Sequence, residues 1–138
     1  MKLLTFLVEH FSWTPFSQTL EDAKPEQHAD HMDDAVVVFL HIEEHDFEEE
    51  RYKKVFNKAL KHIKWLANKK KFRNIVLHSF AHLGGTNASP IDAEEWMNSM
   101  AERLENTGYT VKLTPFGWFC SWEIKVHGDS LAKVWKEF

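Results

Sequence analysis

Apolar residues recur along the chain with two different periods, which separate strands from helices. The apolar runs at 2–8 and 35–42 are rich in branched side chains and too short for ordinary helices, so both predict buried strands. Between them, aromatic and polar residues alternate at 11–17, which is the period of a half-buried strand or hairpin arm. The polar stretch Gln18 to Asp34 contains Pro25 and predicts a loop.

Helical spacing replaces this alternation in two segments. From about Glu48 to Lys69, apolar residues fall every three or four positions, so one face packs on the sheet while lysines occupy the other. A second helix is expected to begin at Ser89-Pro90, where a capping hydroxyl precedes a proline in the first turn, and to end at Gly108. Its expected buried face consists of Trp96, Met97, Met100 and Leu104.

Strands and one turn account for most of the remaining chain. We predict strands at 74–78, 109–113 and 118–126, then a short helix after Gly128 that buries Leu131, Val134 and Trp135. The turn Thr114–Gly117 is so short that we expect it to join antiparallel neighbours. This order of elements predicts an α/β (α+β) fold: a mixed, largely antiparallel sheet with two main helices and a short C-terminal helix.

Length and composition fit one folded unit over residues 1–138. With 43% hydrophobic residues the chain has enough apolar mass for one core. A single cysteine excludes an internal disulfide framework. The opening apolar run is cut short by Glu9 and His10, and no segment approaches the ~20 apolar residues of a spanning helix. We therefore expect a cytoplasmic protein with no membrane contact.

Charge is segregated along the first predicted helix, although the net charge is only −4. This balance excludes a global basic field of the kind that drives non-specific nucleic-acid binding. An acidic run at 43–50 precedes a series of lysines and one arginine at 53–73. The simpler interpretation is a solvated helix whose charges complement its macrodipole. The alternative is a basic helix face that contacts a tRNA backbone locally.

The loop that follows the strand at 74–78 carries the strongest candidate chemistry. Ligands of α/β sheets gather at the carboxyl ends of strands, and the loop Phe80–Gly85 leaves such an end and precedes a helix. Its glycines let backbone amides approach a ligand closely, and a neutral imidazole at His82 could orient a hydroxyl or a water. The alternative is a histidine that only satisfies a buried backbone group.

Histidine spacing argues against a metal centre. Three close pairs occur among the nine histidines: His28 and His31, His41 and His45, and His78 and His82. A structural zinc site takes four His or Cys ligands and a catalytic site takes a compact set of three, and no pair supplies either. We expect neither a metal nor a cofactor.

Cys120 has two interpretations. It is a candidate nucleophile, with His82 as its base, because a catalytic thiol needs an imidazole or positive potential to form the thiolate. It also alternates with Trp118 and Trp122 on one strand face, which is typical of a small buried hydrophobe. The other tryptophans fall at core spacing: Trp13, Trp65, Trp96 and Trp135.

Three segments resemble the archaeal threonyl-tRNA synthetase editing domain: FAHL at 80–83, TPFGWF at 114–119 and EIKVHGDSLA at 123–132. The opening strand, the strand at 35–42 and the long helix also follow the family's order and spacing, so the resemblance covers the whole chain. It implies a fold like that of D-aminoacyl-tRNA deacylases, including the D-tyrosyl-tRNA enzymes, and a homodimer. It also implies hydrolysis of serine wrongly esterified to threonine tRNA.

The resemblance implies a pocket lined by backbone groups of two loops. His82 matches a family histidine, and the terminal ribose hydroxyl of the tRNA would assist an attacking water. The implied partner is the 3′ end of charged tRNA, tRNA-Thr by analogy, together with a threonyl-tRNA synthetase if the chain acts in trans. The implied substrate-binding residues are Phe80, Ala81, Leu83, Gly84, Pro115, Phe116, Gly117, Trp118 and Phe119.

Several positions depart from the family pattern. Cys120 stands where the family has a lysine and Lys133 where it has a glutamate, so both are carried as candidate catalytic positions. Leu7 replaces a histidine, and Gly84 replaces a hydroxyl residue. Loss of one positioned polar group often costs ~2–4 kcal/mol of transition-state stabilisation. The sequence thus predicts an aminoacyl-tRNA deacylase, with a non-catalytic tRNA- or ligand-binding domain of the same fold as the alternative.

Overall fold

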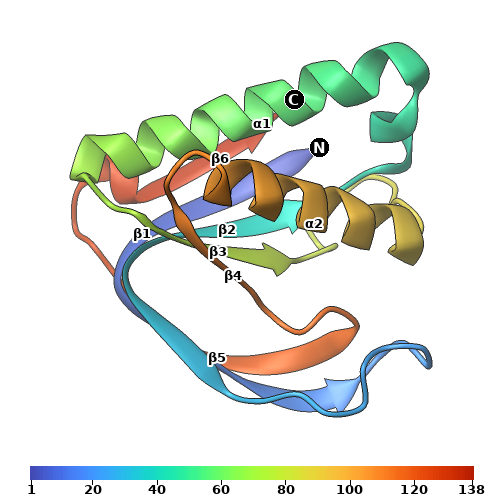
Figure 1. The fold of residues 1–138 in the computed structure, drawn as a ribbon, viewed down its shortest axis with the longest axis horizontal. Helices are drawn as coiled ribbons and strands as arrows, with labels where there is room; N and C mark the ends of the chain where they lie inside the picture. Colours follow the sequence, from blue (N-terminus) through green and yellow to red (C-terminus); the bar gives the residue numbers. More distant parts are fainter.

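The computed structural model describes all 138 residues and contains one mixed sheet with two long helices on one face (Figure 1). Neither helix is long and apolar enough to cross a membrane. The elements in chain order are β1 (Lys2–Gln18), β2 (Asp30–His41), a 3₁₀ turn η1 (Glu44–Phe47), α1 (Glu49–Lys70), β3 (Asn74–Ser79), α2 (Pro90–Glu105), β4 (Thr110–Leu113), β5 (Trp118–Val126), a second 3₁₀ turn η2 (Ser130–Ala132) and β6 (Lys133–Glu137).

The sheet is organised around the long strand β1. Strand order is β4-β3-β2-β1-β5, with β2, β3 and β4 parallel to one another and β1 antiparallel to its partners. On one edge β1 pairs with β6 through Lys2–Phe6 and then with β5 through Val8–Gln18. The mixed sheet and the two main helices confirm the predicted fold class.

Two apolar clusters hold the layers together. The larger one, of 23 buried residues, lies between the sheet and the helices and includes Trp96. The smaller one, of eight buried residues, lies on the opposite face, towards β5, and includes Phe39. Alternation along β3 sends Ile75 and Leu77 to the helix side and Val76 to the other. His78, two residues further on, therefore faces the β5 side.

The two main helices follow their sequence signals closely. Helix α1 has acidic residues in its first turn and lysines in its last. Helix α2 begins at Pro90, and the Ser89 hydroxyl accepts a hydrogen bond of 3.1 Å from the Asp92 backbone N–H. The helix ends at Glu105, and Gly108 follows it with φ of +96°.

The predicted loop Gln18–Asp34 is shorter in the structure, at residues 19–29. Both flanking strands extend further because polar residues also pair across the ladder: Ser12 lies opposite His31, and His10 Nδ1 lies 2.6 Å from Asp33 Oδ1. These positions are polar because one side of the hairpin faces solvent, and a polar strand of this kind looks like a loop in sequence.

The prediction that Thr114–Gly117 joins antiparallel neighbours is wrong. Strand β4 is one edge of the sheet and β5 is beyond β1, so three strands separate them in sheet order. The sheet curls strongly, and β5 folds beneath its helix-free face (Figure 1). As a result the rings of Phe39 on β2 and Trp122 on β5 are 4.9 Å apart although β2 and β5 do not pair.

The predicted C-terminal helix is also wrong, because residues 133–137 form strand β6. Residues Lys2–Phe6 of β1 pair with β2 on one side, and β6 pairs with their other edge. The Thr5 hydroxyl adds a hydrogen bond of 3.0 Å to the carbonyl of Val134. Trp135 consequently points outward and is 52% exposed, and Trp65 on α1 is 45% exposed, whereas Trp13 and Trp96 are buried as predicted.

Candidate functional site

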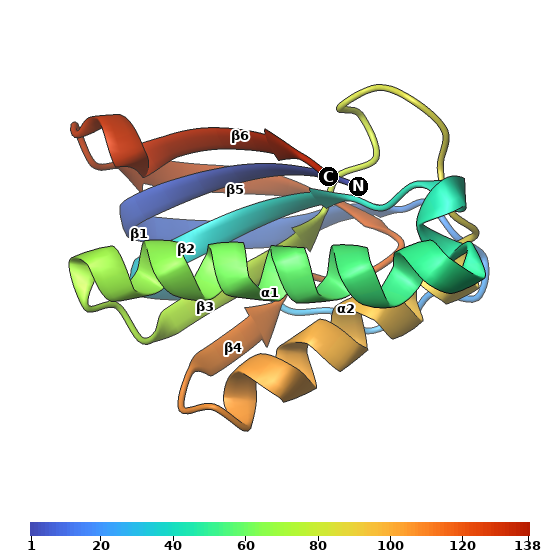
Figure 2. The same cartoon turned by 90° about the horizontal axis from the view of Figure 1, so that it is seen from above.

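A cavity of about 700 Å³ lies at the carboxyl ends of β2 and β3. Its walls come from the loop 80–89, the start of the β1–β2 loop, the turn 114–117, the start of β5 and the first turn of α2. The loop 80–89 arches beside the end of β2 in Figure 2. The cavity therefore occupies the place at which open α/β sheets bind ligands.

Most of the predicted site residues line this one cavity: His82, Cys120, Phe80, Ala81, Pro115, Phe116, Gly117, Trp118 and Phe119. Three predicted residues do not line it: Leu83, Gly84 and Lys133. Lys133 is the first residue of β6, where its ammonium donates a hydrogen bond of 3.2 Å to the carbonyl of His127. The expected convergence of the FAHL loop and the PFG turn is present, whereas Lys133 stands apart from both.

His41, at the end of β2, fixes the backbone of the loop 80–89. Its Nδ1 accepts a hydrogen bond of 3.1 Å from the N–H of Leu83, so the ring proton is on Nε2. Nε2 then donates to the side-chain oxygen of Asn87 at 2.7 Å and to the carbonyl of Thr86 at 2.9 Å. One buried imidazole thus connects three points of the loop and specifies its shape.

Lys2 on β1 and Glu43, which follows β2, anchor the same loop. The ammonium of Lys2 bonds the Glu43 carboxylate at 2.5 Å and the carbonyl of Gly84 at 2.9 Å. Burial alone would raise the pKa of Glu43, but hydrogen bonds from Lys2 and the Met1 ammonium outweigh it and lower this pKa to about 2. A Cβ on Gly85 would lie 2.1 Å from the Glu43 carboxylate, so only glycine fits there.

The PFG turn is clamped to the β1–β2 loop on the opposite wall. The carbonyl of Gly117 accepts hydrogen bonds from the N–H groups of Thr19 at 2.7 Å and Leu20 at 3.3 Å. The Trp118 indole donates to the carbonyl of Lys24 at 3.0 Å. Gly117 has φ of +79°, and a Cβ on it would lie 2.8 Å from Ala23. Glycine is therefore required for both backbone and contact reasons.

His78 and Thr114 form a buried polar pair in the cavity wall. His78 Nδ1 and the Thr114 hydroxyl share a hydrogen bond of 2.7 Å. The imidazole packs among aromatic rings, with centroids 4.8 Å from Phe39, 5.2 Å from Trp122 and 6.1 Å from Phe80. Burial lowers the pKa of His78 to about 4, so this ring is neutral at physiological pH.

His82 and Cys120 are in different environments. His82 is exposed, and its ring packs edge-to-face on Phe80 with centroids 5.2 Å apart. Burial raises the pKa of the half-buried Cys120 thiol, which opposes formation of a thiolate. These surroundings favour a neutral thiol that contributes volume and contact over a nucleophile.

No Asp, Glu, Lys or Arg side chain lines the larger cavity. Its titratable groups are His78, His82 and Cys120. Several backbone N–H groups on the two loops make no hydrogen bond within the chain: those of Ala81, His82, Phe116 and Gly117. The residues that line the cavity therefore combine neutral side chains with unpaired amides, a composition suited to a carbonyl or oxyanion rather than to a bare cation.

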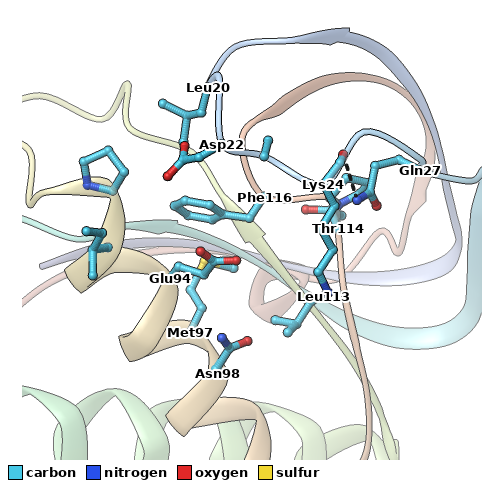
Figure 3. Close-up of a pocket in the computed structure, with 14 residues that line it drawn as sticks. Leu20, Asp22, Lys24, Gln27, Glu94, Met97, Asn98, Leu113, Thr114 and Phe116 are labelled. Carbon is cyan, nitrogen blue, oxygen red and sulfur yellow. Dashed lines mark hydrogen bonds between the residues drawn. The ribbon is translucent and has the colours of Figure 1, made fainter.

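A smaller cavity of about 410 Å³ lies on the other side of the PFG turn. Phe116 extends between Leu20 and Asp22 of the β1–β2 loop and Glu94 of α2 (Figure 3). Leu20 and Phe116 line both cavities, so the turn and the loop form a wall common to them. Unlike the larger cavity, this one is bordered by charged side chains, including Lys24.

One cluster in the chain has the composition of a metal site. Ligand atoms of Glu43, His45 and Asp46 lie within 4.8 Å of one another. The Met1 ammonium already lies 2.6 Å from Glu43 and 2.9 Å from Asp46, and Arg51 lies 3.3 Å from Asp46. The pair His41 and His45 is divided, since His41 binds the loop 80–89 while His45 belongs to this cluster.

His41, His78 and Lys2 were missed as site residues from sequence. From sequence both histidines fit only weak metal-ligand pairs, yet His41 is the last residue of β2 and His78 lies next to the last residue of β3, at the sheet edge that carries the loop 80–89. That position was the available signal, because strand ends point side chains at the loops that follow. Nothing in the sequence indicated that Lys2 reaches Gly84, which is 82 residues away.

Relatives of known identity align with nearly the whole chain. Threonine–tRNA ligase of Staphylothermus marinus is 32% identical over an alignment of 142 residues, covering 99% of this chain and 22% of that protein. The ligase of Thermococcus kodakarensis is 29% identical and covers 97% of this chain. That of Methanosphaera stadtmanae is 32% identical and covers 83%. The chain spans about a fifth of the length of these relatives.

Two further comparisons concern fold and family. A solved structure of the c-Myc DNA unwinding element binding protein superimposes with a TM-score of 0.64 at 19% identity, covering 100% of this chain and 99% of that one. This likeness shows a shared fold, which is the deacylase-like fold expected from sequence. The family described as the archaea-specific editing domain of threonyl-tRNA synthetase matches residues 1–138. This chain belongs to that family of editing domains.

Proposed function

We propose that this domain hydrolyses the aminoacyl ester of wrongly charged tRNA, with seryl-tRNA(Thr) as its substrate. Family membership supports a proofreading role. The observation that carries the proposal is the single cavity that joins the FAHL loop to the PFG turn, with free backbone amides on both. Discrimination of threonine from serine by one methyl group yields only ~1–3 kcal/mol, so hydrolysis of the error is needed for accuracy.

The proposed reaction is addition of water to the ester carbonyl. Water adds to the carbonyl carbon, a tetrahedral oxyanion forms, and the ribose 3′ oxygen leaves with a proton, which yields free serine and tRNA. N–H groups of Ala81, His82, Phe116 and Gly117 would stabilise the oxyanion. His82, exposed at the cavity, would orient the water or the terminal ribose hydroxyl.

The positions that depart from the family pattern receive limited roles. Cys120 lines the cavity as a neutral thiol, so we assign it contact with substrate and no nucleophilic step. Lys133 lies outside the cavity, so we assign it no part in the reaction. Leu7 is fully buried on the helix side of the sheet, away from the candidate chemistry.

The proposed partner is the 3′ end of charged tRNA-Thr, reached in the cytoplasm. Because the chain spans about a fifth of its ligase relatives, it acts either as part of a synthetase or in trans beside one. We also propose a homodimer. Large exposed apolar side chains on β1 and β5 support it, namely Phe16, Phe119 and Ile124.

A second candidate is a non-catalytic domain that binds charged tRNA or another ligand. Its support is the uncharged cavity, in which His82, His78 and Cys120 are the only titratable side chains. This candidate predicts ligand binding without turnover.

The test is release of labelled serine from seryl-tRNA(Thr), with threonyl-tRNA(Thr) as counter-substrate. We expect serine-selective release that falls at least tenfold in His82→Ala, about the size expected when a general acid–base or water-orienting group is lost. His28→Ala is the matched control, because His28 is an exposed histidine outside both cavities. Release no faster than spontaneous hydrolysis would refute the enzyme and favour the binding domain.

A further inference from the structure

His78 occupies the cavity wall with one ring nitrogen uncommitted. Nδ1 is bound to Thr114, and Nε2 has no partner within the chain. The side-chain polar atoms that are both unpaired and sealed from solvent are His62 Nε2, Trp96 Nε1 and His127 Nε2. His78 Nε2 is not among them, so it retains access to the cavity that its residue lines.

Rigid support makes this nitrogen suitable for recognition. The imidazole is held by the Thr114 hydroxyl at 2.7 Å, and Thr114 is fixed in turn by its N–H, which donates to the carbonyl of Leu77 at 3.1 Å. Phe39 and Trp122 pack against the ring. The His78 side chain is therefore ordered before a ligand binds, so a hydrogen bond to Nε2 costs little further conformational entropy.

The chemistry of the wall selects an uncharged ligand group. No charged side chain lines the cavity, and the buried imidazole is neutral. At His78 Nε2 a phosphate group would lose hydration without gaining a counter-charge. A hydroxyl can donate or accept, so it matches His78 Nε2 in either tautomer.

We propose that His78, held by Thr114, binds a hydroxyl group of the ligand and makes recognition of the ligand depend on that hydroxyl. The inference rests on the proposed function for the identity of the ligand. An aminoacylated 3′ end carries two hydroxyls beside the ester: the side-chain hydroxyl of serine and the ribose 2′-hydroxyl. His78 Nε2 forms a hydrogen bond with one of these two hydroxyls.

Binding of non-hydrolysable analogues separates this proposal from hydrolysis. The probes are 3′-seryl-amido adenosine, its alanyl counterpart and the 2′-deoxy form of the seryl compound, titrated by calorimetry against the wild-type chain and His78→Phe. We expect the wild type to prefer one hydroxyl-bearing probe over its partner by about five- to tenfold, as one neutral hydrogen bond allows. In His78→Phe that ratio should fall to about 1.

Three further variants test the role of the imidazole itself. His78→Gln keeps an amide group near the place of Nε2 and should restore part of the preference. Thr114→Val removes the partner of Nδ1 and should weaken the preference without abolishing it. His62→Phe makes the same substitution at a buried histidine of α1 outside the cavity, and its ratios should match the wild type.

The outcomes distinguish this inference from the proposed function. Loss of the seryl-over-alanyl preference assigns Nε2 to the side chain, and loss of the ribo-over-deoxy preference assigns it to the ribose. Ratios unchanged in folded His78→Phe overturn the inference, whether or not the protein hydrolyses seryl-tRNA(Thr). Changed ratios without turnover uphold the inference and refute the enzyme. A wild type that binds none of the probes overturns both.

Discussion

The two histidines that line the larger cavity, His82 and His78, differ in burial and in the groups around them. His82 is exposed, and its ring packs edge-to-face on Phe80. His78 is enclosed by aromatic rings, and burial lowers its pKa to about 4. The same residue type thus supplies a mobile polar group at the cavity mouth and a fixed neutral one in its wall.

The low pKa of His78 makes stability depend on pH. Because the unfolded side chain has a pKa near 6.5, the unfolded state binds a proton between about pH 6.5 and 4 that the folded state does not. The contribution is complete above about pH 6.5 and is lost as the pH falls through 4. We expect it to be roughly 3 kcal/mol.

Urea unfolding of the wild type and His78→Phe at pH 7, 5.5 and 4 measures this effect. The free energy of unfolding should fall more steeply with acid in the wild type, because the variant has no imidazole to protonate. Carboxylates titrate in both proteins, so they cancel in the difference. Parallel curves over this range would show that His78 is not protected from protonation.

At this scale the sequence located the candidate loop 80–85 but not the residues that support it. His82 and the PFG turn were found because short motifs are visible as contiguous residues. Lys2, His41 and Thr114 act through partners 36 to 82 positions away, and no local pattern records such a contact. Only the assembled sheet brings them to the cavity.

At the scale of elements, the clamp between the β1–β2 loop and the PFG turn depends on Gly117. Gly117→Ala would add a Cβ 2.8 Å from Ala23 at a residue whose φ is +79°. We expect a loss of about 2–4 kcal/mol, from left-handed backbone strain plus displacement of the loop. Gly108→Ala is the matched control, with φ of +96° and no atom within 4 Å of its Cβ, so it should lose only ~1–2 kcal/mol.

Hydrogen exchange of individual amides shows which part of the Gly117→Ala variant has lost stability. Amides of Thr19 and Leu20 donate to the Gly117 carbonyl, so their protection should fall in Gly117→Ala and be retained in Gly108→Ala. Equal protection in the two variants would mean that the loop is not held by this turn.

Strand β6 provides a second test at this scale, because the sequence favoured a helix there. Spacing of Leu131, Val134 and Trp135 fits one helical face, and the unpaired edge of β1 overrides that local pattern. The Phe138 N–H donates to the Met1 carbonyl, so by alternation the Lys136 N–H points at β1 and the Glu137 N–H points away.

Proline substitutions at the exposed residues Lys136 and Glu137 test whether this segment is a strand or a helix. Lys136→Pro should lower the free energy of unfolding by about 1–3 kcal/mol, since it removes a ladder hydrogen bond. Glu137→Pro should have less effect because its N–H is not paired within the sheet. Equal losses, measured by urea denaturation, would contradict the strand assignment.

The strands and helices themselves were largely predictable, whereas their arrangement was not. Caps and periodicity located α1 and α2 within a few residues. The turn Thr114–Gly117 misled because turn length is a local quantity, while the curl of the sheet that brings β4 towards β5 arises from all strands together. The spacing of apolar residues along the sequence does not predict that curl.

At the scale of the whole molecule, the exposed apolar side chains favour self-association. Phe16 is 81% exposed on β1, and Phe119, which pairs with the adjacent Ser17, is 58% exposed on β5. Strand β5 also ends the sheet with an unpaired edge. Exposed aromatic side chains on two paired strands, beside an open edge, are the features that a second copy of the chain would cover.

We therefore expect sedimentation at micromolar concentration to show a dimer. A double variant Phe16→Asp, Phe119→Asp should shift it to a monomer, because carboxylates cannot be buried without partners. Ile91→Asp is the control: Ile91 is 67% exposed, but it lies on α2. A wild-type monomer would remove the dimer proposal, and a dimer that survives the double variant would place the contact on another face. Because the PFG turn leads directly into β5, a dimer built on this edge would also restrain one wall of the cavity. Phe119 lines that cavity, so serine release is measured in Phe16→Asp alone, whose side chain lies outside it, and should fall together with the sedimentation coefficient.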